Sequence, residues 1–319
     1  MLEPSTRRKG LLAMHVPGSM RPGGAPGEGL ATTEHFLLSF DGQRLYATEK
    51  GTAEGAGVVL CFPPCLNSHE FFDCPVPGYS LMDFLVSTGF RVFAYDPRGF
   101  GRSYRPPDGR SITQEVELRD AGAFLDFVLS ETGTGAVAMV GFGSGGVAAC
   151  NLASLRPERV SALALMDFVW LHSQAAHAPP GVREMLLACP DGYLPLSELA
   201  GFFEGALRFA EPEVCAWNAA AFRVAPVGPF LKVWNPTPYI PFPGEIRASV
   251  LILRGTEAGI TSEADSLDFL GRVGGPLRIL DVVEGAGPVP SLEARHHRRV
   301  LEDIAWFLGR QLPRREEAQ

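Results

Sequence analysis

The sequence predicts an α/β protein with a mostly parallel sheet that is covered by helices on both faces, and with a helical cap inserted late in the chain. Three observations lead to this class. Short apolar runs alternate with amphipathic segments between residues 57 and 167, a pattern typical of βαβ units. The same alternation returns from residue 247 to residue 312. Between these two regions, residues 168–246 change to short amphipathic segments and a proline-rich run.

The first predicted elements are a hairpin and a buried strand. Residues 34–40 and 44–50 flank Asp41-Gly42, a favoured hairpin turn. The run at 57–62 is apolar throughout, as expected of a strand that is buried on both faces. Further strands are predicted at 90–96, 136–141, 160–167, 249–255 and 277–283, and helices at 79–89, 115–132, 145–158, 262–273 and 291–312.

These elements divide the chain into a core, a cap and two tails. The core comprises residues 31–167 and 247–312, and the cap comprises residues 168–246. Residues 1–30 are rich in proline and glycine and lack periodic apolar positions, which predicts a disordered tail. A second, C-terminal tail is expected at 313–319. Because open α/β sheets bind ligands beyond the carboxyl ends of their strands, we look for chemistry in the loops that follow them.

Composition excludes several classes of partner. The formal net charge is −8, and no patch of Lys and Arg is large enough to neutralise a row of phosphates, so we expect no nucleic-acid partner. No apolar run approaches the roughly 20 residues of a membrane span. We therefore expect a cytoplasmic protein that has no membrane partner.

The six cysteines are expected to be reduced, because we find no export signal. Three of them, Cys61, Cys65 and Cys74, lie close to His69 and share with it the chemistry of zinc ligands. Their spacing is not that of a common zinc site, and a pair of prolines between the first two prevents a helix that would align them. The sequence therefore predicts no metal and no cofactor.

Five motifs resemble the α/β-hydrolase superfamily in their order and setting. They read YDPRGFGRS, VGFGSGG, RPERVSALALMD, LILRGTEAGI and EGAGPVPSLEA, and the resemblance extends over residues 34–311. It implies a lid inserted after the sixth strand. It also implies a Gly-x-nucleophile-x-Gly turn, which joins a strand to a helix and holds the nucleophile at a strained corner.

In this frame Gly143 falls at the nucleophile position. Gly141 and Gly145 match the two flanking glycines, and the following helix reaches residues 156–159 with the family's usual spacing. The alternative frame would seat Ser144 at the tip, but it places Phe142 where a small residue is needed for close packing. The strained backbone of the tip is also easier for glycine than for a residue with a Cβ.

The later motifs lack the other members of the family's catalytic triad. The acid position falls on Ala258, next to Glu257, and the base position falls on Pro288. In the oxyanion loop, the family's usual His-Gly is absent from residues 61–64, and Pro64 has no N–H to offer an oxyanion. Together with Gly143, these changes predict that triad-based acyl transfer has been lost.

Four polar side chains remain as catalytic candidates. Ser144 follows the tip, either as a displaced nucleophile for which we can assign no base or as an ordinary helix-start hydroxyl. Asp167 and Glu257 end predicted strands and could act as acid or base, or could cap a helix or pair with an arginine. His69 follows the strand at 57–62 and is expected to border the pocket, where its imidazole could transfer a proton or bind a ligand.

Other residues are assigned to the pocket or to structure. Asp96 and Arg98 are expected to be structural, whereas cap residues His172 and His177 could face inward; His296 and His297 are expected on a solvated helix face. The predicted ligand pocket comprises Phe62, Pro64, Phe142, Gly143, Ser144, Phe168 and Val289. Cap aromatic residues that could line a cavity or simply form core are Phe168, Trp170, Phe202, Phe203, Trp217, Phe222 and Trp234.

The leading functional hypothesis is a catalytically degenerate member of the superfamily. Such a protein would bind a small apolar ligand between cap and core, or a protein partner at its surface. The second hypothesis is an enzyme with lyase or cyclase chemistry and no covalent intermediate. A third is an esterase or other acyl hydrolase that works through Ser144.

Overall fold

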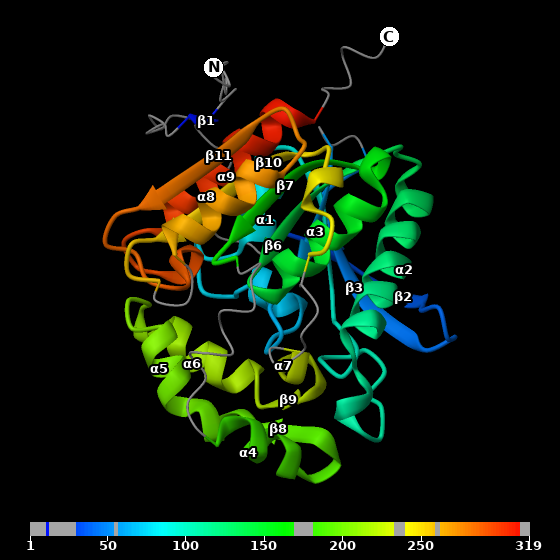
Figure 1. Cartoon of the computed structure of the whole chain (residues 1–319), viewed down its shortest axis with the longest axis vertical. Coiled ribbons are helices and arrows are strands. Elements are labelled where there is room, and N and C mark those ends of the chain that lie inside the picture. The colour runs from blue at the N-terminus through cyan, green and yellow to red at the C-terminus, as the bar shows by residue number, and fades with distance from the viewer. Residues whose placement is uncertain are drawn as a thin grey trace, which may run out of the picture.

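A nine-stranded, mostly parallel sheet forms the centre of the molecule. The computed structural model describes residues 11–12, 30–53, 57–168, 181–232, 240–258 and 262–312. The strands lie in the order β1-β11-β10-β7-β6-β4-β5-β3-β2, and only the β2–β3 and β3–β5 pairs are antiparallel (Figure 1). The strands are β1 Leu11–Leu12, β2 Thr32–Leu38, β3 Arg44–Lys50, β4 Val58–Phe62, β5 Arg91–Tyr95, β6 Val137–Phe142, β7 Val160–Met166, β10 Ser249–Gly255 and β11 Arg278–Val283.

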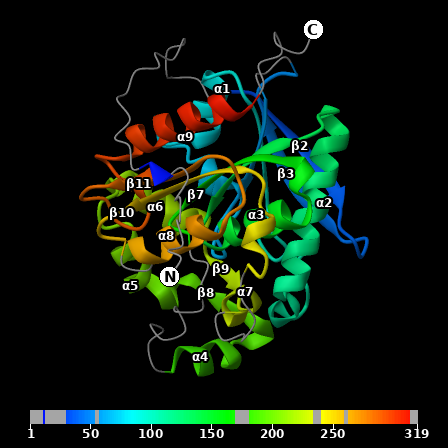
Figure 2. The same cartoon turned by 45° about the horizontal axis from the view of Figure 1, so that its top comes forward.

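Helices cover both faces of this sheet, as the sequence predicts. The covering helices are α1 Leu81–Ser87 and α9 His297–Gln311 on one face, and α2 Gln114–Thr132, α3 Ser144–Leu155 and α8 Glu263–Arg272 on the other (Figures 1 and 2). Strand β4 shows how the two cores form. Val59 and Cys61 pack in the α1/α9 core, whereas Leu60 and Phe62 pack in the α2/α3/α8 core. Successive residues of a strand face opposite sides, so a run buried on both sides must be apolar throughout.

The hairpin at the start of the sheet is confirmed. Strands β2 and β3 pair antiparallel with Phe36 opposite Tyr46. Their turn needs a residue with positive φ, which Gly42 provides at 78°. The backbone N–H of Ser39 donates to the carbonyl oxygen of Gln43 at 2.8 Å and closes the turn.

Two predicted boundaries differ from the structure. Leu11–Leu12, which lie inside the predicted disordered tail, form β1 and pair with Arg278 and Ile279 of β11; the tail residues 1–10, 13–29 and 313–319 lie outside the described residues. The closing helix was predicted from residue 291 but α9 begins at His297. Pro290–Leu292 form a short 3-10 turn instead, and the extended backbone of Glu293, with φ −88° and ψ 137°, separates this turn from α9.

Residues 181–232, called here the insertion, lie between β7 and β10 within the predicted cap. They contain α4 Val182–Ala188, β8 Tyr193–Pro195, α5 Ala200–Ala206, α6 Pro212–Ala221, β9 Val224–Pro226 and α7 Gly228–Leu231. These elements gather at one end of the molecule in Figure 1. The predicted cap extended to residue 246, but Ile240 and Ile246 are buried in the α2/α3/α8 core.

The insertion is attached to the loop before α2 by polar contacts. The Arg110 guanidinium donates to the Leu187 carbonyl oxygen at 2.7 Å, and the Tyr193 hydroxyl donates to the carbonyl oxygen of Pro106 at 2.8 Å. At its far end, Lys232 donates to Glu117 of α2 at 2.9 Å. These contacts attach the insertion to α2 and to the loop that precedes it.

Candidate functional site

The turn between β6 and α3 has Gly143 at its tip. This residue has φ 50° and ψ −117°, a conformation that is strained for any residue with a Cβ, and Ser144 begins the helix after it. A Cβ on Gly145 would lie 2.0 Å from the Phe62 carbonyl oxygen, and a Cβ on Gly141 would lie 2.5 Å from the Cα of Gly146. The flanking glycines therefore allow close backbone packing, and the half-buried Gly143 occupies the corner.

Beyond this turn lies a cavity of about 280 Å³ between the sheet and the insertion. Its walls come from the loops after β4, β6, β7 and β11 and from α5, α6 and α7. Most of them are apolar: Pro64, Leu66, Phe71, Phe142, Gly143, Val147, Phe202, Phe203, Ala206, Leu207, Pro229, Phe230, Pro288 and Val289. The polar lining residues are Cys65, Asn67, Ser144, Asp167, Asn218 and Lys232. This composition is typical of a site for a mostly apolar small molecule.

Five of the seven predicted pocket residues line this cavity: Pro64, Phe142, Gly143, Ser144 and Val289. The prediction was wrong for Phe62, whose ring packs against Tyr95 and Phe124 with centroids 5.7 and 5.8 Å apart. It was also wrong for Phe168, whose ring centroid lies 4.8 Å from that of Phe269. Both side chains belong to the α2/α3/α8 core.

The predicted acid candidates are separated by the fold. Asp167 is buried and lines the cavity, and it has a positive φ of 42°, which is uncommon outside glycine. Glu257 is exposed and lies 3.3 Å from Arg208, so it is a surface ion-pair residue and does not line the cavity. Its neighbour Ala258 is buried, whereas Pro288 lines the cavity.

The sequence predicts that His69 borders the cavity, but His69 is not among the lining residues. Its ring nitrogen Nδ1 lies 2.6 Å from Asp96 Oδ1, its backbone N–H donates to the same oxygen at 3.0 Å, and its ring packs edge-on against Tyr46. Burial alone lowers the pKa of His69, but the hydrogen bond and negative charge of Asp96 outweigh burial and leave that pKa raised. The imidazole therefore fastens the loop that follows β4.

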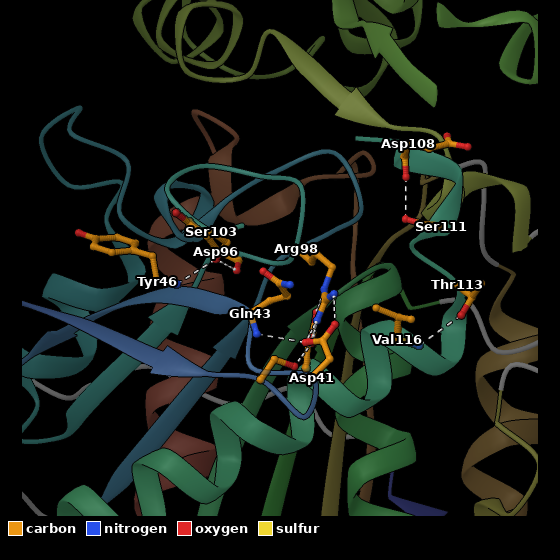
Figure 3. A network of polar contacts seen from close by, with 12 residues as sticks. Asp41, Gln43, Tyr46, Asp96, Arg98, Ser103, Asp108, Ser111, Thr113 and Val116 are labelled. Carbon is orange, nitrogen blue, oxygen red and sulfur yellow. Dashed lines mark hydrogen bonds and ion pairs between the residues drawn. The ribbon is translucent and has the colours of Figure 1, made fainter. Parts of the chain in front are cut away.

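Asp96 and Arg98 also have the structural roles that the sequence predicts. Arg98 donates to Asp41 at 2.7 Å (Figure 3). It also donates to the buried Asp120 at 2.8 Å. The backbone carbonyl of Asp96 accepts from Ser103, which in turn accepts from the N–H of Tyr46 (Figure 3). This network joins the loop after β5 to the β2–β3 hairpin and to α2.

A thiol and a hydroxyl meet on the cavity floor. Burial raises the pKa of Cys65, and this effect is opposed by the positive charge of Lys232 and by a hydrogen bond with Ser144. Lys232 in turn pairs with Glu117 at 2.9 Å. The pKa of Cys65 remains raised, so its thiol is neutral, and the nearby Lys232 is paired with Glu117.

Sequence reasoning missed four polar residues of the cavity: Cys65 as a wall residue, Asn67, Asn218 and Lys232. Asn67 is 4% exposed, and its Nδ2 has no hydrogen-bond partner among the described residues. The sequence offered one indication that Asn67 could belong to the site, which is its position in the loop after β4. Asn218 and Lys232 lie in the insertion, where no motif of the resemblance marks a functional position.

The remaining candidates do not converge on the cavity. His297 stacks on Tyr79 with ring centroids 4.1 Å apart, and His296 is half-buried near the start of α9. Of the predicted aromatic residues, Phe202 and Phe203 line the cavity, whereas Trp217 and Phe222 pack against each other. Trp170, His172, His177 and Trp234 lie outside the described residues. Within the described ranges, no cluster of three or more His, Cys, Asp or Glu side chains could hold a metal ion.

The sheet order, the strained turn and the cavity define an α/β-hydrolase architecture. The model of the family described as alpha/beta hydrolase fold matches residues 57–272, and the chain belongs to this family. Among the helices that the structure describes, none is long and apolar enough to cross a membrane.

The sequence relatives include epoxide hydrolases. The chain is 30% identical over 186 residues to bifunctional epoxide hydrolase 2 of Sus scrofa, a match covering 58% of this chain and 28% of that protein. It is also 30% identical over 130 residues to an epoxide hydrolase of Caballeronia sordidicola, covering 41% of this chain and 36% of that protein. The matches therefore span well under two thirds of these relatives.

Solved structures of hydrolases share the fold. A hydrolase from Pseudomonas aeruginosa PA01 superposes with a TM-score of 0.67 at 22% identity, covering 86% of this chain and 98% of that one. A monoacylglycerol lipase from Paleococcus ferrophilus gives a TM-score of 0.63 at 18% identity, covering 84% and 99%. At these identities the likeness establishes the architecture.

Proposed function

We propose that this chain is a non-hydrolytic member of the α/β-hydrolase family and that it binds a small apolar molecule in the cavity beneath the insertion. The observation that carries the proposal is Gly143 at the tip of the strained turn, where the family resemblance places the nucleophile. A glycine has no side chain with which to attack a substrate. The apolar lining of the cavity favours an internal small molecule over a protein partner at the surface.

The other triad positions support the same proposal. Pro288 lines the cavity where the resemblance places the base, and a proline side chain cannot carry a proton. Ala258 is buried and apolar at the acid position. Pro64, whose Cβ lies 3.8 Å from the position of a Cβ built on Gly143, offers no N–H to a developing oxyanion. The loss of a triad serine or histidine alone lowers kcat by about a million-fold in a serine protease, so a chain without all three members would retain little acyl transfer.

Ser144 is the residue through which hydrolysis could survive. It lines the cavity beside Cys65, but the lining contains no histidine among the described residues. The test is intact-mass spectrometry after incubation with a fluorophosphonate, followed by peptide mapping, with Ser144→Ala as the control. We expect no adduct. A stoichiometric adduct at Ser144 that disappears in the control variant would establish an esterase-like enzyme and refute the proposal.

Ligand binding needs its own test. The α5 residue Ala206 lines the cavity, whereas its neighbour Glu204 is exposed. We expect n-butylbenzene to bind the wild-type protein in calorimetry and to lose binding in Ala206→Trp, which fills the cavity. The matched variant Glu204→Trp adds the same side chain outside the cavity and should bind normally. Equal binding by both variants would place the ligand elsewhere.

Asp167 favours a second candidate function, catalysis without a covalent intermediate. It places a buried carboxylate in the cavity on a backbone with positive φ, and such strain is concentrated at functional sites. A carboxylate there could move a proton in a lyase or cyclase reaction. Turnover of a cavity ligand that is lost in Asp167→Asn, with binding retained, would establish this function in place of simple binding.

A further inference from the structure

We propose that β2 is a dimerisation strand, which pairs antiparallel with β2 of a second copy of this chain. Figures 1 and 2 show β2 at the outer edge of the sheet, where the strand order ends. The strand contributes no residue to the cavity, so this inference goes beyond the proposed function and does not depend on it. It arises because exposed apolar side chains and unpaired backbone groups occur together on this strand.

Exposed apolar side chains are concentrated at β2. Nine large hydrophobic residues are exposed in the part of the chain that the structure describes, and four of them lie within residues 30–40. These four are Leu30, Phe36, Leu38 and Phe40, with exposed fractions of 41, 45, 69 and 48%. Phe36 and Leu38 lie on one face of the strand, whereas Leu37 between them is buried in the α2/α3/α8 core. Apolar surface that is contiguous and exposed is typical of an interaction site.

The hairpin turn determines which backbone groups of β2 point outward. Ser39 donates its N–H to the carbonyl oxygen of Gln43 at 2.8 Å and accepts from the N–H of Gly42 at 3.0 Å. Hydrogen-bonded and non-hydrogen-bonded positions alternate along an antiparallel pair. The N–H and C=O groups of Leu38 and Phe36 therefore point away from β3.

The opposite residues of β3 agree with this alternation. Arg44 accepts at its carbonyl oxygen from the N–H of Tyr104 at 2.8 Å, and Tyr46 accepts from the N–H of Asp96 at 2.9 Å. Both carbonyl groups thus point away from β2. In the described part of the chain, β2 pairs with β3 alone. It also lacks the proline and lysine residues that commonly protect an edge strand, so its outer backbone groups are available to another strand.

This edge is complementary to itself. The outward positions Glu34, Phe36 and Leu38 are symmetric about Phe36. When two copies pair antiparallel with Phe36 opposite Phe36, each Glu34 lies opposite Leu38 of the other copy, and all three positions can exchange backbone hydrogen bonds. The two Phe36 rings then become neighbours on one face of the joined sheet, where they shield each other from water. A second copy therefore satisfies both the backbone and the apolar side chains of the edge.

The charges on this face favour the same register. Arg44 lies opposite Leu38, and its guanidinium lies 4.3 Å from the centre of the Phe36 ring. It has no carboxylate partner among the described residues. Glu34 pairs with Arg102 at 2.6 Å. In the dimer, Glu34 of the second copy is a diagonal neighbour of Phe36 and lies within reach of the long Arg44 side chain. Two symmetric contacts between opposite charges would then accompany the strand pairing.

Sedimentation velocity over a range of concentrations tests the dimer. We expect the wild-type protein to dimerise and to dissociate on dilution. Phe36→Lys places two ammonium groups opposite each other and should raise the Kd of the dimer at least about tenfold. Leu38→Pro removes an outward N–H, which an edge strand tolerates, and should also weaken the dimer. Leu155→Lys is the matched control, because Leu155 is 58% exposed at the end of α3, and this variant should dimerise normally.

The contact between opposite charges has its own variant. Arg44→Glu places a carboxylate next to Glu34 of the second copy and should weaken the dimer several-fold, whereas Arg44→Gln should weaken it less. A wild-type protein that stays monomeric at about 500 µM would overturn the proposal, since no useful affinity would remain. A dimer that persists unchanged in both Phe36→Lys and Leu38→Pro would overturn it as well.

Amide hydrogen exchange of the wild-type protein covers the case in which the variants do not fold. Exchange in a peptide that spans residues 32–40, measured by mass spectrometry, should slow as the protein concentration rises, because the outward amides become hydrogen-bonded. Slow exchange that does not depend on concentration would show that another part of the same chain covers the edge, and the proposal would then be wrong. Dimerisation without slower exchange in this peptide would place the interface elsewhere and would also contradict it.

Discussion

Replacing Gly143 with alanine measures the strain that this turn imposes on a residue with a Cβ. The φ of 50° and ψ of −117° cost such a residue about 1–3 kcal/mol. Alanine recovers about 0.4–1 kcal/mol by restricting the unfolded chain. Space is available, since the added Cβ would lie 3.8 Å from Pro64 Cβ, an ordinary contact distance. We therefore expect Gly143→Ala to lower the free energy of unfolding by about 1–2 kcal/mol.

The assay is urea unfolding of Gly143→Ala and Gly145→Ala beside the wild-type protein. A Cβ on Gly145 would lie 2.0 Å from the Phe62 carbonyl oxygen, so this control has to displace backbone and should cost about 4 kcal/mol or more. Stabilisation by Gly143→Ala, the usual result at an unstrained glycine, would refute the assignment of this residue to the strained tip. An equal loss of unfolding free energy in Gly143→Ala and Gly145→Ala would also refute this assignment.

Three further predictions concern titration and ion pairing. The raised pKa of His69 means that protonation stabilises the fold fully below the unfolded pKa of about 6.5, and that this contribution is lost as pH rises through the folded pKa. In urea unfolding between pH 6 and 9, the free energy of unfolding of His69→Gln should therefore depend less on pH than that of the wild-type protein. An equal dependence in the two proteins would contradict the role assigned to the imidazole. Burial and the nearby Asp281 raise the pKa of Asp303 to about 7, so its ionisation destabilises the fold increasingly from about pH 4 to pH 7. The difference in free energy of unfolding between Asp303→Asn and the wild-type protein should therefore favour the variant by at least about 1 kcal/mol more at pH 8 than at pH 4. A difference that does not change with pH would show that the charge on this carboxyl does not destabilise the fold. Arg98→Met leaves the buried Asp120 without its cation and should cost about 3–5 kcal/mol in thermal unfolding, with a smaller loss in Arg98→Lys; equal losses would mean that charge contributes nothing there.

The fold was predictable because the information that specifies it is local. The apolar run at 57–62 and the periodic helix at 115–132 correspond to β4 Val58–Phe62 and α2 Gln114–Thr132 within a residue or two. The boundary of α9 was less predictable, because the helical pattern continues upstream through residues that form a turn at Pro290. Periodicity shows which residues can share a face but not where tertiary contacts end a helix.

The cavity was only partly predictable because its walls come from distant segments. Gly143 could be placed because the spacing of neighbouring glycines reflects backbone packing next to it. Phe62 was misplaced because every residue of its strand is apolar, so the pattern does not show which face each side chain takes. Asn67 lines the cavity together with insertion residues that lie over 100 residues later in the chain, and the partner of His69 lies 27 residues away. Neither contact has a local signal.

On the proposed function a binding site replaces a reacting centre, and the geometry of the turn is compatible with this replacement. The close approaches of Gly145 to the Phe62 carbonyl and of Gly141 to Gly146 hold β6 and α3 together, and neither involves a side chain at the tip. The contacts that hold the turn are therefore independent of the side chain at position 143, and glycine relieves the strain there. Gly143 has no side chain that would occupy the cavity, and Pro288 and Pro64, which also line it, present apolar surface. On the proposed function, selection for binding would therefore act on the residues that line the cavity, while the packing that defines the family stays unchanged.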